Sequence, residues 1–204
     1  MHLVPTQDEV VAVLRDTGAL RTGHFEYPSG LHSNEYLQVP LALRYSQHLR
    51  MLSVGLSRKL RAHPEIRAIA HELSIVVPMT GGLPVAFGVA DALRAKQVYW
   101  TEREHDAEAL HFRQFLVPQK GEPVVLVDDI LRTGSKLAEC KQLLESYGAQ
   151  VMGLAVIVYQ PNPKTQSFGN LPLYYLAKLD AHYAVNSQEC GWCQEGEPLQ
   201  KVWL

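Results

Sequence analysis

The residues best suited to chemistry stand in one run, from Val124 to Lys136. Two neighbouring carboxylates, Asp128 and Asp129, follow four apolar residues, and a Thr-Gly-Ser turn at 133–135 comes soon after them. Vicinal sugar hydroxyls can donate hydrogen bonds to such carboxylates, which can also reach a divalent metal ion. The bare backbone N–H groups of a turn that opens a helix can hold a phosphate group. The run therefore predicts a site for a phosphorylated sugar.

A second turn is also suited to binding an anion. Pro78 ends an apolar stretch, and Thr80, Gly81 and Gly82 connect it to the next predicted helix. Residues this small leave backbone amides accessible at the start of the helix. We interpret the turn as a second anion site, beside the first.

Both turns must follow strands of one sheet. The apolar, β-branched residues at 124–127 predict a central parallel strand, and 74–77 predict a second; open α/β sheets bind ligands at the carboxyl ends of such strands. Further strands are predicted over 66–70, 98–101, 151–159 and 173–179. Helices are predicted from the Thr6 capping box to Gly18 and over 46–62, 85–96 and 135–147. This alternation predicts a compact α/β domain with a central parallel sheet flanked by helices.

The composition excludes several classes of protein. The chain has 47% hydrophobic and 20% charged residues and a formal net charge of −2, so we expect no nucleic-acid and no membrane partner. Residues 1–7 lack a leader pattern and the apolar run at 151–159 is too short to span a bilayer, which predicts a cytoplasmic protein. The phosphate motifs G-x-x-x-x-G-K-[ST] and G-x-G-x-x-G do not occur in the predicted contexts, which disfavours nucleoside-triphosphate hydrolysis and dinucleotide binding.

The run over 124–136 resembles the phosphoribosyl pyrophosphate (PRPP) motif of the type I phosphoribosyltransferases. The resemblance implies that Asp128 and Asp129 contact the ribose 2′ and 3′ hydroxyls of PRPP, and that the turn binds its 5′-phosphate. The implied PRPP-binding residues are Asp128, Asp129, Ile130, Leu131, Arg132, Thr133, Gly134, Ser135 and Lys136. It also implies the fold of that family, with an N-terminal helix and a small hood in residues 1–45 and the phosphoribosyltransferase core in 46–204.

Two connecting loops complete the implied site. By resemblance, the loop formed by Met79, Thr80, Gly81 and Gly82 binds pyrophosphate, and we expect a strained or cis peptide near Met79–Thr80. The polar segment 100–111 is typical of a lid that excludes water from the reaction, although a solvated charged hairpin is the alternative. In this lid Arg103 is our candidate for contact with pyrophosphate, and Glu104 or Glu108 for handling a proton or stabilising a cation. The predicted catalytic set is Asp128, Asp129, Arg103 and Glu104.

The segment 23–36 resembles the hood that covers the base in orotate phosphoribosyltransferases. The residues implied to contact the base are Ser29, Gly30 and Tyr36 of the hood and Gln160 after the 151–159 strand. Two departures bear on the base: Pro28 stands where a lysine is usual, and Gln160 where an arginine usually pairs with the orotate carboxylate. A neutral amide replaces a bidentate guanidinium poorly. The pattern of residues in the lid also resembles that of adenine phosphoribosyltransferases more closely.

The predicted activity is transfer of the 5-phosphoribosyl group from PRPP to a nucleobase, with orotate as the first prediction and a purine as the alternative. The resemblance implies a Mg²⁺ cofactor that arrives with the substrate and reaches Asp128 and Asp129, and a homodimer. The rival from another class is a non-catalytic regulator that senses PRPP and binds RNA or DNA, which requires a basic surface and salt-dependent affinity.

Three cysteines do not make a disulfide framework, which fits a reducing compartment. Two of them form a C-x-x-C pair, Cys190 and Cys193, which supplies only half of a zinc site. We interpret the pair as a structural turn with buried thiols, with a redox pair or a metal completed by another subunit as alternatives.

Overall fold

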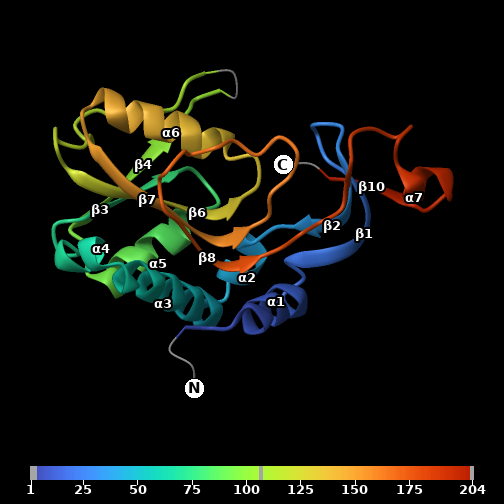
Figure 1. Ribbon diagram of the computed structural model, residues 1–204, viewed down its shortest axis with the longest axis horizontal. Coiled ribbons are helices and arrows are strands. Elements are labelled where there is room, and N and C mark those ends of the chain that lie inside the picture. The colour runs from blue at the N-terminus through green and yellow to red at the C-terminus, as the bar shows by residue number, and fades with distance from the viewer. Residues whose placement is uncertain (1–3, 106–107, 203–204) are drawn as a thin grey trace.

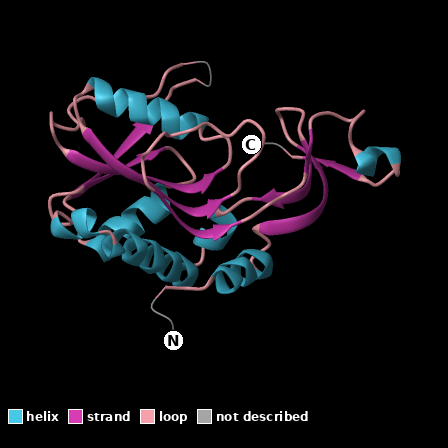
Figure 2. Cartoon of the chain, viewed as in Figure 1, coloured by secondary structure: helices cyan, strands magenta, loops and turns pink. Residues whose placement is uncertain are grey.

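The computed structural model describes residues 4–105 and 108–202, which form a large core and a smaller hood (Figures 1 and 2). The core contains a six-stranded sheet with the order β5-β4-β3-β6-β7-β8, in which every neighbouring pair is parallel except β4–β5. Its strands are β3 (Ser74–Pro78), β4 (Gln97–Glu102), β5 (His111–Phe112), β6 (Pro123–Leu131), β7 (Gln150–Tyr159) and β8 (Leu173–Lys178).

Helices cover both faces of the core sheet, with α6 on one face and α3 and α5 on the other (Figure 1). The alternating side chains of β6 explain this layering, because Val125 and Val127 pack into one core cluster and Val124 and Leu126 into the other. The helices of the core are α3 (Ser46–Ala62), α4 (Pro64–Ala68), α5 (Leu83–Leu93) and α6 (Ser135–Ser146). The predicted central parallel sheet flanked by helices is therefore confirmed.

The hood contains a four-stranded sheet with the order β10-β1-β2-β9. Its strands are β1 (Leu20–Glu26), β2 (His32–Leu37), β9 (Tyr183–Ala184) and β10 (Leu199–Lys201). Strand β1 pairs antiparallel with β2 and parallel with β10, so this sheet joins segments from both ends of the chain. The division into residues 1–45 and 46–204 stays a prediction.

Three further helices are α1 (Gln7–Asp16), which contacts β1 and β8, α2 (Pro40–Leu43), which contacts α1 and α3, and α7 (Gly191–Gln194). The capping box predicted for α1 is present, since the Thr6 side chain accepts from the Glu9 N–H and the Glu9 carboxylate accepts from the Thr6 N–H. Helix α7 lies at the end of the hood farthest from the core (Figure 1). No helix among the described residues is long and apolar enough to cross a membrane.

One predicted strand is wrong. Residues 64–68 form the short helix α4, with Pro64 at its first position and Glu65 in its first turn. Both residues favour a helix start. The β-branched Ile66 and Ile69 favour a strand locally, but Ile66 is buried in the core from a helical backbone instead. Tertiary packing outweighed local strand propensity at this place.

Candidate functional site

The two acids of the PRPP motif lie in the second half of β6. The strand continues through both residues, and its pairing with β7 ends at Leu131 and Tyr159. Asp129 is 8% exposed and Asp128 is part-buried. The Asp129 N–H donates to the Asp128 Oδ1 at 2.9 Å, and the Ile130 N–H donates to the Asp129 Oδ1 at 2.9 Å. Each carboxylate therefore keeps acceptor capacity for a ligand.

The environment of this pair opposes its ionisation. Burial raises the pKa of Asp128 well above its ordinary value, and the neighbouring Asp129 carboxylate raises it further. Burial also raises the pKa of Asp129, although Arg132 acts in the opposite direction. Two adjacent, part-desolvated carboxylates are destabilised as anions unless a cation or hydroxyl donors join them. The pair is thus arranged for binding rather than for internal stability.

The predicted pyrophosphate loop lies directly against these acids. A Cβ placed on Gly82 would lie 2.5 Å from the Asp128 Oδ1 and 2.8 Å from the Val77 Cγ2. A Cβ on Gly81 would lie 3.1 Å from the Asp129 Oδ2. At Gly82 a side chain would force its neighbours to move, and at Gly81 the carboxylate would have to shift by a few tenths of an ångström. The predicted cis peptide between Met79 and Thr80 is present.

The predicted phosphate turn opens helix α6. Gly134 is the N-cap residue with φ of 74°, a conformation that favours glycine, and the Thr133 hydroxyl lies 3.4 Å from the Ser135 backbone N. Ser135 and Lys136 are exposed at the start of the helix. The charge of Lys136 also lowers the pKa of Asp128, which places this ammonium group within electrostatic reach of the acids.

A loop that the sequence did not single out covers the phosphate turn. It connects β7 to β8, and the Gln166 N–H in it donates to the Thr133 carbonyl at 2.8 Å. A Cβ on Gly134 would lie 2.9 Å from the Phe168 ring, so this loop also requires glycine there. Phe168 and Gln166 lie in a stretch rich in Gly, Pro and Asn. That composition predicts a loop but does not show which part of the structure the loop packs against.

Arg132 joins the core to the hood. Its Nε donates to the Gln160 Oε1 at 3.2 Å, its Nη2 donates to the Leu37 carbonyl, and its guanidinium lies 4.9 Å from the centre of the Tyr27 ring. Gln160 is fully buried and also donates to the Glu35 Oε2 at 3.2 Å. The guanidinium is therefore directed toward the predicted base pocket. Of these residues, Tyr27 and Glu35 were not among the predicted site residues.

The other predicted hood residues lie in two places. Ser29 and Gly30 form the turn between β1 and β2, where the Gly30 N–H donates to the Tyr27 carbonyl at 2.8 Å. Ser29 is exposed. Tyr36 lies on β2, with its ring centre 6.1 Å from that of Tyr27 and 5.7 Å from that of Phe25. Tyr36 thus belongs to the aromatic group that includes the ring beneath Arg132.

Arg103 lies on the α6 side of the core. Its Nη2 is 2.5 Å from the Glu139 carboxylate, which also accepts from the Leu110 N–H at 2.6 Å. Glu104 and Glu108 are exposed. Residues 106–107 of the predicted lid lie outside the described residues. The structure therefore anchors the described part of the lid to α6 through the Glu139 carboxylate.

The comparisons with known proteins agree with this geometry. The family model described as "Phosphoribosyl transferase domain" matches residues 55–167. An orotate phosphoribosyltransferase of Pelotomaculum thermopropionicum is 32% identical over 96% of this chain and 96% of its own length. That of Desulforamulus reducens is 29% identical over 96% and 95%.

Solved structures share the fold. An orotate phosphoribosyltransferase from Aeropyrum pernix aligns with a TM-score of 0.65 and 24% identity over 83% of this chain and 93% of its own. An adenine phosphoribosyltransferase from Thermoanaerobacter pseudethanolicus aligns with a TM-score of 0.58 and 17% identity over 71% and 88%. Together with the family match and the 32% identical relative, these likenesses show that the chain belongs to the phosphoribosyltransferase family.

Proposed function

We propose that this protein transfers the 5-phosphoribosyl group of PRPP to orotate, giving orotidine 5′-monophosphate and pyrophosphate. The observation that carries the proposal is the contact of the Gly81–Gly82 turn with Asp128 and Asp129, beside the start of α6. This arrangement places two carboxylates, which accept hydrogen bonds from sugar hydroxyls, between two turns lined by backbone amides. It matches a sugar that carries phosphate at one end and pyrophosphate at the other. The orotate-named relatives support the choice of base.

The residues divide the reaction between them. Asp128 and Asp129 accept hydrogen bonds from the ribose 2′ and 3′ hydroxyls, and the turn over 133–135 holds the 5′-phosphate. The 79–82 loop holds the pyrophosphate as the bond to the anomeric carbon breaks. Fixing both ends of the sugar sets the anomeric carbon in line with the attacking nitrogen of the base, which lowers the entropic part of the barrier.

The acids also fit a Mg²⁺ ion. Their pKa values are raised by burial and by their mutual proximity, so a divalent cation beside them relieves the cost of ionising both. Asp128 and Asp129 are the residues that would hold it, together with oxygens of the substrate. When bound, the ion supplies positive charge that stabilises the leaving pyrophosphate.

Arg132 supplies the cation for the base. The arginine that pairs with the orotate carboxylate in the resembling enzymes is replaced here by Gln160, but the Arg132 guanidinium contacts that same Gln160 side chain. A guanidinium next to a buried amide restores a charged donor for a carboxylate. The hood residues Tyr27, Glu35 and Tyr36 then enclose the base.

Arg103 and Glu104 act when the lid closes. Arg103 exchanges its ion pair with Glu139 for the leaving pyrophosphate, and the exposed Glu104 handles a proton or stabilises the cationic transition state.

The protein is also proposed to form a homodimer and to lie in the cytoplasm. An open hollow beside the pyrophosphate loop is lined by Phe87 and Trp100, and the 52% exposed Phe87 is suited to a contact between two copies. The free cysteines fit a reducing compartment.

The test is pyrophosphate release from PRPP and Mg²⁺ with each of six bases: orotate, uracil, adenine, guanine, hypoxanthine and xanthine. We expect release with orotate alone, and loss of orotate use in Arg132→Ala. Release with adenine would assign the purine alternative. If none of the six bases causes pyrophosphate release, and the protein binds RNA or DNA with a salt-dependent affinity, the protein would be the regulator instead.

A further inference from the structure

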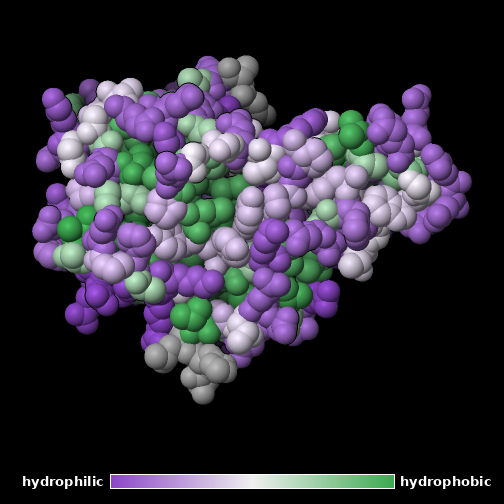
Figure 3. Space-filling view, viewed as in Figure 1, coloured by the Kyte–Doolittle hydropathy of each residue, from purple (hydrophilic) through white to green (hydrophobic). Residues whose placement is uncertain are grey.

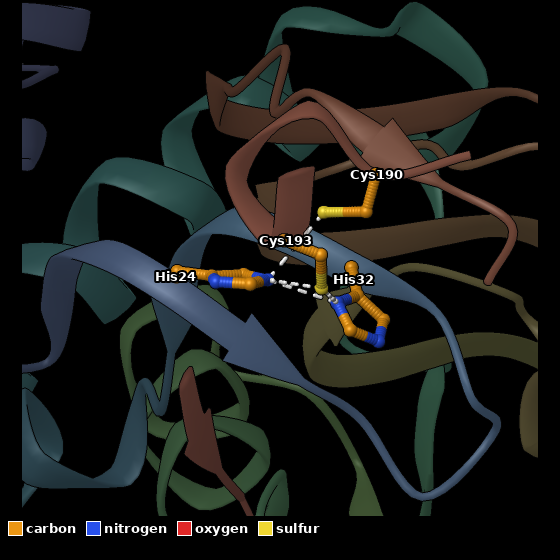
Figure 4. Close-up of side chains that lie close together, drawn as sticks. All are labelled: His24, His32, Cys190 and Cys193. Atoms are coloured by element: carbon orange, nitrogen blue, oxygen red, sulfur yellow. Dashed lines mark hydrogen bonds between the residues drawn. The ribbon is translucent and has the colours of Figure 1, made fainter. Parts of the chain in front are cut away.

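Four side chains with metal-binding atoms converge at the outer end of the hood (Figure 4). His24 comes from β1 and His32 from the start of β2. Cys190 immediately precedes α7, and Cys193 lies in the first turn of that helix. The imidazole nitrogens and the thiol sulfurs all lie within 4.8 Å of one another. The C-x-x-C pair therefore has its other half in the same chain, more than 150 residues away in sequence.

Three of the ligand–ligand separations match those of a tetrahedral zinc site, and all of them are within 4.8 Å. The His24 Nε2 lies 2.9 Å from the His32 Nδ1, 3.4 Å from the Cys190 Sγ and 3.6 Å from the Cys193 Sγ. The Cys193 Sγ lies 3.5 Å from the His32 Nδ1. Zinc bond lengths of about 2.0–2.1 Å to nitrogen and about 2.3 Å to sulfur give ligand–ligand separations of roughly 3.3–3.8 Å at the tetrahedral angle. Only the pair of nitrogens is closer than that range.

Contacts behind the ligands orient them. The His24 Nδ1 lies 3.2 Å from the Glu197 carbonyl oxygen, which can only accept a hydrogen bond, so Nδ1 carries the proton and Nε2 presents its lone pair to the cluster. This is the arrangement found behind metal-bound histidines. The Trp192 ring lies 5.9 Å from the His24 ring, and His24, His32 and Cys190 are buried.

The segment that carries the cysteines is held by the pairing of β10 with β1 but buries little apolar surface. Helix α7 has four residues with none buried, strand β10 has three exposed residues, and residues 195–201 are all exposed. Figure 3 shows a mostly polar surface at this end of the hood. Apolar burial therefore contributes little to fixing this segment, and a metal tie between α7 and the β1–β2 hairpin supplies the missing stabilisation.

We propose that His24, His32, Cys190 and Cys193 bind one zinc ion that fastens the C-terminal segment to the hood. All four ligands come from protein, so the site has no open position for a substrate and its role is structural. The interpretation of the cysteines as buried thiols in a turn, and the alternative of a metal completed by another subunit, are replaced by a site within one chain. This inference does not depend on the proposed function.

The first test measures metal in the intact protein. The untagged chain, purified without chelators, is expected to contain one zinc per chain by elemental mass spectrometry. Chelation should release it, lower the midpoint of thermal unfolding and expose two thiols to a thiol reagent. Cobalt added to the metal-free chain should give the visible absorption of a tetrahedral site with two thiolate ligands, a signature that does not depend on enzyme activity. Zinc should then displace the cobalt.

Variants locate the site. Cys193→Ser and His32→Ala are expected to lose stoichiometric zinc, whereas Cys140→Ala, at the buried cysteine outside the cluster, should keep it. The wild-type titration keeps the test decisive if a variant fails to fold. A Cys190–Cys193 disulfide in the freshly purified protein, or a metal-free chain that takes up neither zinc nor cobalt under reducing conditions, would overturn the proposal.

Discussion

Carboxylates lie at both ends of β6, with Glu122 just before the strand and Asp128 and Asp129 near its carboxyl end, and the two ends differ in how those groups are satisfied. At the amino end, Glu122 is 6% exposed and accepts from the Ser74 hydroxyl at 2.5 Å, the Gln97 amide at 2.8 Å and the Gln119 N–H at 2.8 Å. These hydrogen bonds lower its pKa despite burial. At the carboxyl end, Asp128 and Asp129 have few partners and raised pKa values.

The contrast shows that the two ends of one strand contribute separately to stability and to binding. A fully hydrogen-bonded carboxylate stabilises the folded chain and has no capacity left for a ligand. A crowded, under-satisfied pair reduces stability and gains most when a ligand supplies the missing donors. Burial alone therefore does not distinguish the two ends, but the inventory of hydrogen bonds does.

The largest expected effect comes from removing the charges at the binding end. Asp128→Asn with Asp129→Asn should reduce kcat/KM about 10²–10⁴-fold, because two charge-assisted hydrogen bonds to the ribose are lost. The free energy of unfolding at pH 7 should stay equal or rise. Kinetics with PRPP and urea denaturation measure the two quantities, and Asp91→Asn on the exposed face of α5 is the matched control. Near wild-type turnover in the double variant would remove the assignment of the acids.

The second effect tests the contact between the loop and the acids. In Gly82→Ala the new methyl group must displace the Asp128 carboxylate at 2.5 Å or the Val77 side chain at 2.8 Å. A shift of the acids by roughly 1 Å should lower kcat/KM about 10²-fold. Gly191→Ala, where nothing lies within 4 Å of the added Cβ, should change neither activity nor stability. Unchanged kinetics in Gly82→Ala would mean that the loop adapts and that its glycine is not required.

Local sequence patterns predicted the parallel sheet and the two turns well, because each depends on residues within one short run. The β-branched strand at 124–127, the glycines at 81–82 and the Thr-Gly-Ser turn all carry their geometry in their own residue types. Strands β3, β4, β7 and β8 were predicted within two residues at each end. Strand β6 was predicted to end before the acids, but it continues through them to Leu131.

The rest depends on contacts between distant segments. Neither the Arg132–Gln160–Glu35 contacts nor the Phe168 cover over Gly134 has a local signature. The two histidines of the proposed zinc site were missed for the same reason, since His24 and His32 flank a hairpin while Cys190 and Cys193, which the sequence identified as half of a zinc site, lie near the other end of the chain. The available signal was the pair of histidines eight residues apart combined with an unexplained C-x-x-C.

A smaller effect is expected at the stabilising end of β6. Glu122→Gln should lower the free energy of unfolding by about 1–3 kcal/mol at pH 7, because the amide cannot accept all the hydrogen bonds that the carboxylate accepts. Turnover per folded molecule should not change, since Glu122 lies at the amino end of the strand, away from the acids. Urea denaturation and active-site titration separate the two outcomes. A loss of kcat in fully folded Glu122→Gln would show that the two ends of β6 are coupled.

The pH dependence of stability should have opposite signs at the two ends. The pKa of Glu122 is lowered from 4.5, so its stabilisation is present above that value and is lost as the pH falls through the folded-state pKa. The pKa values of Asp128 and Asp129 are raised from 3.8, so their contribution is present below 3.8 and is lost as the pH rises through the folded-state values. As the pH rises from about 3 to 7, the free energy of unfolding of Asp128→Asn/Asp129→Asn should rise relative to wild type, whereas that of Glu122→Gln should fall relative to wild type below pH 4.5, where wild-type Glu122 loses its proton. Urea denaturation of the three proteins across this range measures both differences, and parallel curves would show that the two ends do not differ in electrostatics.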